Sequence, residues 1–260
     1  MAVGYIHSVE VGSFVDGPGT RFVVFLTGCP LQCQYCHNPD VCRTRGERTD
    51  SSDVIARISR TAQFLKSGGG GVTLSGGEPL SQPGFALAIL KGAKTLGLHT
   101  AIETSGFIGD RVNPEILDNL DLVLLDIKSF DPATYREVTG GDIAQTLRFA
   151  EKLADECKPA WIRFVLVPGL TDDPANITGL ARFVAGLANV ERVEIVPFHQ
   201  MGRQKWEDLG LPYKLADTKP PTEDELQRAT DLFEAEGVAV GKRHLAPCDS
   251  TAQLTEGDGR

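Results

Sequence analysis

Short apolar runs alternate with amphipathic stretches along most of this 260-residue chain. The runs are rich in Val, Ile, Leu and Phe without strict alternation, which is typical of strands covered on both faces. We predict six strands, at Arg21–Leu26, Gly71–Leu74, His99–Glu103, Leu122–Asp126, Trp161–Val167 and Arg192–Val196. We predict helices at Asp53–Lys66, Phe85–Leu96, Ile143–Glu156, Asn176–Leu187 and Glu223–Glu236, the last of them begun by a capping box, Thr222 to Glu225.

This order of elements restricts the topology. Strands separated by helices form parallel β/α units with right-handed crossovers. Six units make an incomplete barrel, because a closed one needs eight and the chain has no room for two more. We therefore expect an α/β fold, an incomplete (β/α)6 TIM-like barrel. It should occupy a single domain over residues 1–246, followed by a polar, Gly-rich and disordered tail over 247–260.

Charge and hydropathy exclude several classes of function. The formal net charge is −9, whereas nucleic-acid binders usually carry a basic domain or stripe. The N-terminus shows no signal peptide, and the apolar runs are too short to span a bilayer. We therefore expect a cytoplasmic protein with neither nucleic acid nor membrane as a partner. In that reducing compartment, clustered cysteines are more often metal ligands or redox groups than disulfides.

Residues capable of chemistry follow the predicted strands. In barrels of parallel strands the carboxyl ends meet at one face, and functional side chains gather there. The segments that follow the six strands in order are Cys29–Cys36, Ser75–Pro79, Thr104–Gly106, Asp126–Lys128, Pro168-Gly169 and Pro197–His199. We expect them to converge on one site.

The first of these segments carries three cysteines, Cys29, Cys33 and Cys36, at C-x3-C-x2-C spacing. Iron–sulfur clusters normally use four cysteine ligands, so three would leave one iron with an open position. A structural zinc site is the alternative, with Cys42 or His37 as the fourth ligand.

A thioredoxin-like redox pair at Cys33 and Cys36 is disfavoured. Such a pair should begin a helix, whereas this segment reaches Pro39 three residues after Cys36. The Gly-rich segment after the second strand does not fit the G-x-G-x-x-G dinucleotide pattern either, which argues against NAD binding.

The three-cysteine spacing, with the aromatic Tyr35 before the last cysteine, resembles the hallmark of the radical S-adenosylmethionine (SAM) superfamily. The similarity continues along nearly the whole chain and is specific to the pyruvate formate-lyase-activating enzyme family. It is carried by His7-Ser8, Asp16–Gly19, Tyr35–Asn38, Gly69–Thr73, Ser75–Glu78, Asp126–Lys128, Trp161–Arg163, Val167–Gly169, Pro197–His199, Tyr213–Leu215 and Lys219–Pro221.

The resemblance implies one [4Fe-4S] cluster held by Cys29, Cys33 and Cys36. It implies that the reduced cluster cleaves SAM to methionine and a 5′-deoxyadenosyl radical, which takes a hydrogen atom from a glycine Cα of pyruvate formate-lyase. Flavodoxin or ferredoxin would supply the electron. The chain lacks the extra cysteine clusters of activases with an inserted ferredoxin-like domain, which favours the pyruvate formate-lyase branch.

The resemblance also implies which residues contact SAM. Glycines let a backbone approach a ligand closely, and a lysine can offset a carboxylate as a point charge. A histidine offers a donor and an acceptor for the ribose or adenine. The predicted SAM-binding residues are Tyr35, Cys36, His37, Gly77, Asp126, Ile127, Lys128 and His199.

Four more residues are candidates by the same resemblance. Asp16 would lie near the substrate peptide, although Pro18-Gly19 beside it also fits an ordinary type II turn. Glu103 and Thr104 correspond to a monovalent-cation site, where the family commonly has Asp in place of Glu103. Arg163 would be a further charge for the carboxylate of SAM.

Several features stay open at this level. We expect Arg43, Arg45 or Arg48 to meet an acidic electron donor. Cys42, Cys157 and Cys248 have no partners at metal-ligand spacing, and we expect Cys157 to be packed at a helix end. Three alternative functions remain. They are an activase of another glycyl-radical enzyme, a radical SAM enzyme for a small molecule, and a non-enzymatic zinc-binding module.

Overall fold

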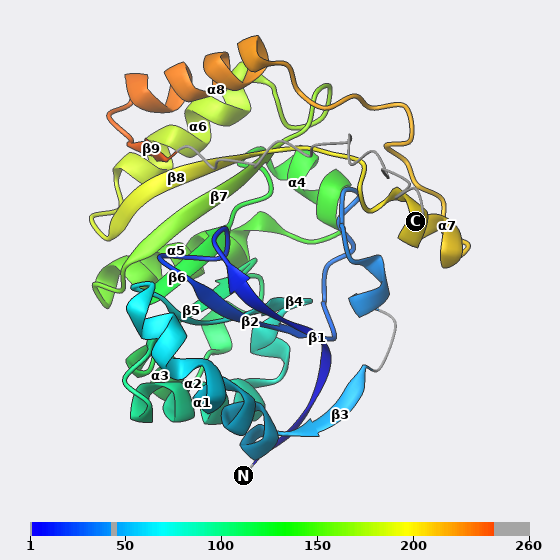
Figure 1. The fold of residues 1–260 in the computed structure, drawn as a ribbon. Helices are drawn as coiled ribbons and strands as arrows, with labels where there is room; N and C mark the ends of the chain where they lie inside the picture. The colour runs from blue at the N-terminus through cyan, green and yellow to red at the C-terminus, as the bar shows by residue number, and fades with distance from the viewer. Residues whose placement is uncertain (1, 43–45, 242–260) are drawn as a thin grey trace, which may run out of the picture.

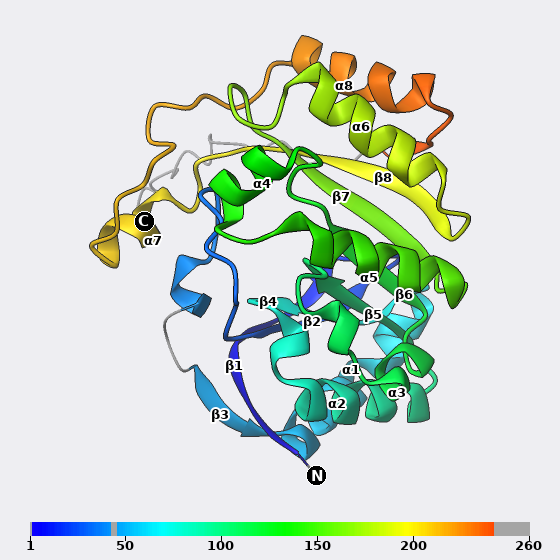
Figure 2. The same cartoon turned by 180° about the vertical axis from the view of Figure 1, so that it is seen from behind.

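The computed structural model describes residues 2–42 and 46–241. Their strands form one sheet in the order β3-β1-β2-β4-β5-β6-β7-β8-β9. The sheet is curved, and helices pack along its outer face (Figures 1 and 2). The strands are β1 (Val3–Ser13), β2 (Arg21–Leu26), β3 (Glu47–Asp50), β4 (Gly71–Gly76), β5 (His99–Thr104), β6 (Leu122–Asp126), β7 (Ala160–Leu166), β8 (Val190–Pro197) and β9 (Val240–Gly241).

Eight α-helices and three 3-10 helices connect the strands in the described part of the chain. The α-helices are α1 (Ser51–Ser67), α2 (Pro83–Thr95), α3 (Pro114–Asp118), α4 (Pro132–Thr139), α5 (Ile143–Asp155), α6 (Pro174–Ala185), α7 (Arg203–Asp208) and α8 (Glu223–Ala235). The 3-10 helices are η1 (Pro39–Cys42), η2 (Pro79–Ser81) and η3 (Gly109–Arg111).

The six predicted strands are confirmed as β2 and β4 to β8, which lie side by side and run parallel. Together with the helices between them they form the expected incomplete barrel. Three strands were not predicted. β1 pairs antiparallel with β2, β3 pairs antiparallel with β1, and the two-residue β9 pairs with β8. β1, which lies between β3 and β2, was missed because it lacks the unbroken apolar run of the parallel strands: its apolar residues alternate with polar, more exposed ones.

Helix caps explain where the helices differ from the prediction. The side chain of Asp50 accepts a hydrogen bond from the backbone of Ser52 and starts α1 ahead of the predicted Asp53. Pro83 and Pro174 stand at the first positions of α2 and α6, where a missing N–H has no consequence. The predicted capping box between Thr222 and Glu225 is confirmed at the start of α8.

One packing prediction is wrong. Cys157 follows α5 as expected, but its side chain is exposed and its φ is +49°. Its backbone N–H donates to Ala154 and that of Lys158 donates to Leu153, so Cys157 takes the left-handed position that closes a helix.

The alternation of side chains along the parallel strands separates the core from the barrel interior. Residues such as Val24, Leu74 and Leu125 face outward and pack beneath the helices in the main hydrophobic core. The intervening positions face inward and carry polar side chains, including Ser75 and Arg163. The barrel interior therefore combines these polar side chains with a separate apolar cluster of Ala101, Leu122, Leu124 and Trp161.

Several sequence predictions fall on residues that the structure leaves undescribed. The domain boundary at residue 246, the disordered tail over 247–260 and Cys248 lie beyond Gly241. Arg43 and Arg45 lie in the gap between residues 42 and 46. These predictions stay as stated. No helix of the described part is long and apolar enough to cross a membrane.

Candidate active site

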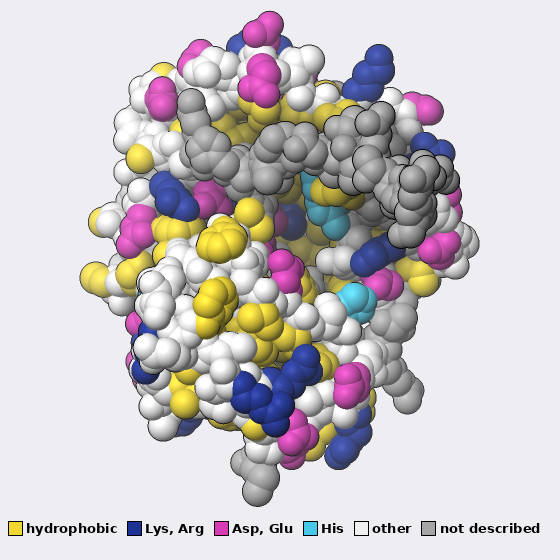
Figure 3. Space-filling model, in the orientation of Figure 1, with side chains coloured by type: hydrophobic (Ala, Val, Ile, Leu, Met, Phe, Trp, Pro, Cys, Tyr) yellow, Lys and Arg dark blue, Asp and Glu magenta, His cyan; other side chains and the backbone are white. Residues whose placement is uncertain are grey.

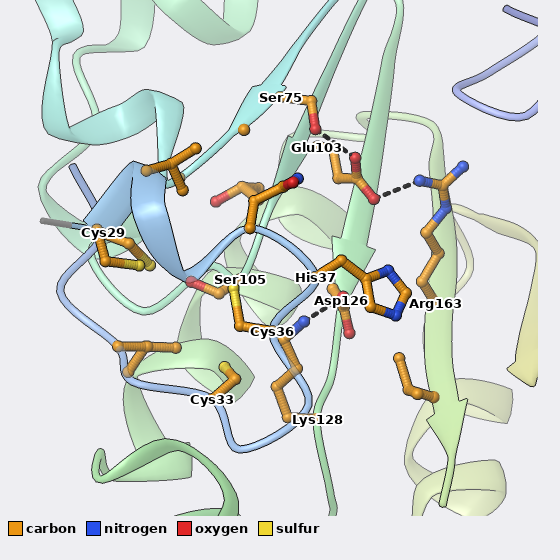
Figure 4. Close-up of a pocket in the computed structure, with 18 of the residues that line it drawn as sticks. Cys29, Cys33, Cys36, His37, Ser75, Glu103, Ser105, Asp126, Lys128 and Arg163 are labelled. Atoms are coloured by element: carbon orange, nitrogen blue, oxygen red, sulfur yellow. Dashed lines mark hydrogen bonds and ion pairs between the residues drawn. The ribbon is translucent and has the colours of Figure 1, made fainter. Parts of the chain in front are cut away.

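A pocket opens at the carboxyl ends of the parallel strands, as the sequence predicted, and it is visible as a hollow in Figure 3. Each of the six parallel strands contributes an inward-facing residue. They are Phe25, Ser75, Glu103, Asp126, Arg163 and Val196. The cysteine loop after β2 forms the opposite wall, and Cys29, Cys33 and Cys36 all line the pocket (Figure 4).

The end of α4 holds the cysteine loop in place. The backbone N–H groups of Gln32 and Gln34 donate to the carbonyls of Thr139 and Val138, over 3.0 and 2.9 Å. The side-chain amide of Gln34 donates to the carbonyl of Glu137 at 2.7 Å. These are carbonyls of the last turn of a helix, which have no partner within the helix itself. α4 was not among the helices predicted from the sequence, so this anchor was missed.

A fourth thiol lies beside the three predicted ligands. The backbone N–H of Gly28 donates to the carbonyl of Val41 at 2.7 Å, which brings η1 against the cysteine loop. Cys42 therefore lines the pocket, and its thiol hydrogen-bonds with Cys29 and Cys36. These bonds lower the pKa of Cys29 and lower that of Cys36 to about 7, and they raise the pKa of Cys42.

Cys33 behaves differently from its neighbours. Burial raises the pKa of its thiol to about 12, although the nearby Lys128 acts in the opposite direction. Within residues 2–42 and 46–241, no group of three or more His, Cys, Asp or Glu side chains is arranged to hold a single metal ion. Three soft thiols on one loop are nevertheless the donor set that iron–sulfur clusters use.

Lys128 and Asp126 form an ion pair inside the pocket (Figure 4). The ammonium of Lys128 also lies 5.5 Å from the centre of the Tyr35 ring. Burial alone would lower the pKa of Lys128, but Asp126, Tyr35 and Cys33 raise it well above its ordinary value. The lysine therefore stays cationic although it is buried.

Two buried polar atoms in this region have no hydrogen-bond partner among residues 2–42 and 46–241. They are the hydroxyl of Tyr35 and the Oδ1 atom of Asp126. Burial raises the pKa of Tyr35, so the hydroxyl keeps its proton. Buried polar groups are rarely left unpaired, and each such exception calls for an explanation. A polar ligand that accepts from Tyr35 and donates to Asp126 would satisfy both.

The Gly-rich loop after β4 packs directly on the cysteine loop. The backbone N–H groups of Gly77 and Glu78 donate to the carbonyls of Leu26 and Gly28, at 2.8 and 2.7 Å. A Cβ atom on Gly77 would clash with the Gly28 carbonyl, so this close approach requires glycine. Gly77 also lines the pocket, and its predicted contact with SAM stays a prediction.

Glu78 connects the loops after β4 and β5, a role that the sequence analysis did not assign. Its carboxylate is fully buried and accepts from the hydroxyl of Thr104 at 2.7 Å and from the backbone and hydroxyl of Ser105 at 3.0 and 2.7 Å. Burial raises the pKa of Glu78, while these hydrogen bonds act to lower it.

The carboxylate of Glu103 is bound by other side chains of the protein. It accepts from Ser75 at 2.5 Å and pairs with the guanidinium of Arg163 (Figure 4). Arg163 also bonds Glu194 at 3.1 Å and the carbonyl of Val15. The carboxylate that the resemblance assigns to a cation thus already has a cationic partner. The cation site at Glu103 and Thr104 stays a prediction.

The remaining predicted residues divide into two groups. Asp16 and His37 line the pocket, and Asp16 accepts a hydrogen bond from Ser13 at 2.5 Å. His199 reaches the site through His37, because the two rings are stacked with centres 3.9 Å apart. Ile127 is buried in the main core, so only its backbone can face a ligand.

Comparison with known proteins decides the family. The model of the radical SAM superfamily matches residues 23–180, which hold five of the six parallel strands in whole or in part and the cysteine loop. The chain is 42% identical to the pyruvate formate-lyase-activating enzyme of Streptococcus mutans over 93% of its length and 95% of that protein. The chain belongs to the radical SAM superfamily and to the pyruvate formate-lyase-activating enzyme family.

Further relatives agree with this assignment. The identity is 41% to the enzyme of that name from Staphylococcus epidermidis, over 88% of this chain and 94% of that one. It is 38% to pyruvate formate-lyase 1-activating enzyme of Escherichia coli K12, over 92% and 98%. A crystal structure of a domain of pyruvate-formate lyase-activating enzyme from Bacteroides vulgatus matches with a TM-score of 0.57 and 26% identity, over 67% of this chain and 99% of that one.

Proposed function

We propose that the protein activates pyruvate formate-lyase by generating a glycyl radical on it. The observation that carries the proposal is the convergence, in one pocket, of three cysteines with Lys128 and Asp126, in a chain of the activating-enzyme family. Enzymes of the radical SAM superfamily use a [4Fe-4S] cluster and SAM. Bound here, this pair would supply the one-electron cleavage of SAM and the hydrogen abstraction from glycine.

The residues present fit both groups. Cys29, Cys33 and Cys36 would hold the cluster, and three ligands leave one iron open for SAM. The hydroxyl of Tyr35 and the Oδ1 atom of Asp126 are available for hydrogen bonds to SAM. Gly77 would let the backbone approach it closely.

The other predicted contacts with SAM are the backbone of Cys36 and Ile127, and the side chains of His37 and His199. Arg163 would add a charge near the carboxylate of SAM. These assignments follow the positions of the residues around the pocket and the family resemblance.

The protein's own residues orient the ligand and exclude water from the pocket. Lys128 stays charged beside Asp126 and can orient an anionic group of a ligand. Behind Tyr35 lies a second apolar cluster, with Val138, Val167, Phe198 and Leu215, that keeps water from this wall of the pocket. Asp16, which is buried and lines the pocket, would lie near the glycine-bearing segment of the partner protein. A dry pocket limits side reactions of reactive intermediates.

An anaerobic assay tests the proposal. The protein is reconstituted with iron and sulfide, reduced with dithionite and given SAM, with and without pyruvate formate-lyase. We expect 5′-deoxyadenosine in both cases and a glycyl-radical EPR signal only with the partner. C36S should abolish both products, whereas C157S is a matched control because Cys157 is exposed and outside the pocket.

Other outcomes of this assay would redirect the assignment. Deoxyadenosine without a glycyl radical would point to another glycyl-radical enzyme or a small molecule as substrate. A colourless protein with stoichiometric zinc and no SAM cleavage would contradict the proposal and favour the zinc-binding module.

We further propose flavodoxin or ferredoxin as the electron donor and the cytoplasm as the location, where thiols stay reduced. Arg48 is exposed on β3, which follows the cysteine loop, and suits an acidic donor. R48E should slow reduction by flavodoxin and leave reduction by dithionite unchanged. Equal rates with flavodoxin for R48E and the wild type would exclude this residue from the docking surface.

A further inference from the structure

The short helix α7, which follows β8, lies against the cysteine loop although the two are far apart in sequence (Figure 1). The indole N–H of Trp206 donates to the backbone carbonyl of Cys36 at 2.9 Å. The ammonium of Lys205 donates to the side-chain carbonyl of Asn38 at 2.6 Å and lies 3.5 Å from a carboxylate oxygen of Asp40. Neighbouring residues of one helix therefore hold successive parts of one loop.

The approach of the two segments is close enough to restrict the sequence. A Cβ atom on Gly202, the residue before α7, would lie 2.8 Å from the Cα of His37 and 3.1 Å from the carbonyl oxygen of Cys36. Real Cβ atoms do not come so near a backbone, so a larger residue would push the loop away. The stacked rings of His37 and His199 add a contact from the same side.

The segment that carries α7 is itself held in place. The side-chain amide of Gln200 donates to the carbonyls of Leu215, Ala216 and Thr218, at 3.0, 3.0 and 2.6 Å. The ring of Trp206 lies 5.7 Å from that of Tyr213. The indole N–H therefore has a defined position from which it can orient the peptide group of Cys36.

We propose that α7 is a positioning element of the cysteine loop, in which Trp206 orients the peptide group of Cys36 and Lys205 holds the side chain of Asn38, two residues further along. This inference rests on the proposed function, since it concerns the third cluster ligand and the adjoining residue His37. Trp206 does not touch the reacting atoms. It acts by keeping Cys36 and His37 in the orientation that the cluster and SAM require.

The test replaces Trp206 with Phe, which keeps an aromatic ring and removes only the N–H donor. A neutral hydrogen bond shifts an equilibrium by about fivefold, and we expect W206F to raise the Kd for SAM by about that factor. We also expect a broadened EPR signal of the reduced cluster in the presence of SAM. Iron and sulfide content should match the wild type, because the three thiols remain.

W161F is the matched control. Trp161 also donates its indole N–H, to Glu191 at 2.7 Å, but it does not line the pocket. We expect W161F to lose stability and to keep the SAM affinity and the EPR signal. K205M supplies a second variant at a partly exposed site, and we expect a change in the same direction as W206F.

The outcomes separate this inference from the proposed function. If the wild type assembles a cluster and binds SAM, and both W206F and K205M match it in Kd and EPR signal, α7 is merely structural and the inference is overturned. If W206F does not fold, K205M alone decides by the same two measurements. A wild type without cluster or SAM binding would overturn the proposed function and the inference together.

Discussion

Two arginines are fully buried inside the barrel, one at the start of β2 and the other midway along β7, where it lines the pocket. Arg163 pairs with Glu103 and Glu194. Arg21 starts β2 and has no carboxylate within ion-pair distance among the described residues. It donates instead to Thr73 at 2.9 Å and to the carbonyl of Val72 at 2.6 Å.

The surroundings change the two cations in opposite directions. Burial lowers the pKa of Arg21 to about 10, with only partial compensation from Asp16 and Asp121. Burial would also lower the pKa of Arg163, but Glu103 and then Glu194 raise it overall. Arg21 is therefore held by hydrogen bonds to neutral groups, whereas two carboxylates compensate the charge of Arg163.

Removing Arg163 is the most severe way to test this contrast. R163M would leave Glu103 and Glu194 without their shared cation, and breaking a buried ion pair costs about 3–5 kcal/mol. Urea unfolding under anaerobic conditions measures the loss in the free energy of unfolding. A loss below about 1 kcal/mol would mean that Ser75 and Arg192, the other partners of the two glutamates, suffice.

Removing Arg21 should have a smaller effect. R21M deletes hydrogen bonds to neutral groups but leaves no buried carboxylate without a partner, so we expect a loss of about 1–3 kcal/mol. SAM binding should be retained, since Arg21 is outside the pocket. The contrast between the two arginines fails if R21M proves as destabilising as R163M in the same urea titration.

The smallest effects concern two carboxyls whose pKa values shift in opposite directions. Burial raises the pKa of Glu78, near the site, above its ordinary 4.5, so the folded state binds the proton more tightly. The stability of the wild type relative to E78Q should therefore rise as the pH falls from 7 toward 4.5.

Asp121, directly before β6, shows the reverse. Burial would raise its pKa, but the bond from Lys94 lowers it overall below its ordinary 3.8. Its contribution is present above pH 3.8 and is lost as the pH falls through the folded-state value. D121N should destabilise slightly at pH 6 and not at pH 2.5, by thermal unfolding. If the stability changes of D121N and E78Q depended on pH in the same way, the two pKa values would not shift in opposite directions.

The sequence allowed a specific prediction of the fold and of much of the site. The strands from Arg21 to Val196 were found because buried parallel strands leave unbroken apolar runs. The convergence of Cys36, Asp126 and Lys128 followed from the rule that parallel strands end at one face. The sequence did not reveal that the side chain of Ile127 packs in the main core, because a strand-end position does not fix which way a side chain points, and its contact with SAM stays a prediction.

What the sequence by itself determined is the local pattern: strand and helix order, the cysteine spacing and the glycines of close loops. Only the tertiary structure decided which segments support them. Gln34 bonds Glu137, 103 residues away, and Trp206 bonds Cys36, 170 residues away. Periodicity and spacing report on neighbours along the chain, whereas these contacts depend on how distant loops meet after the barrel has formed.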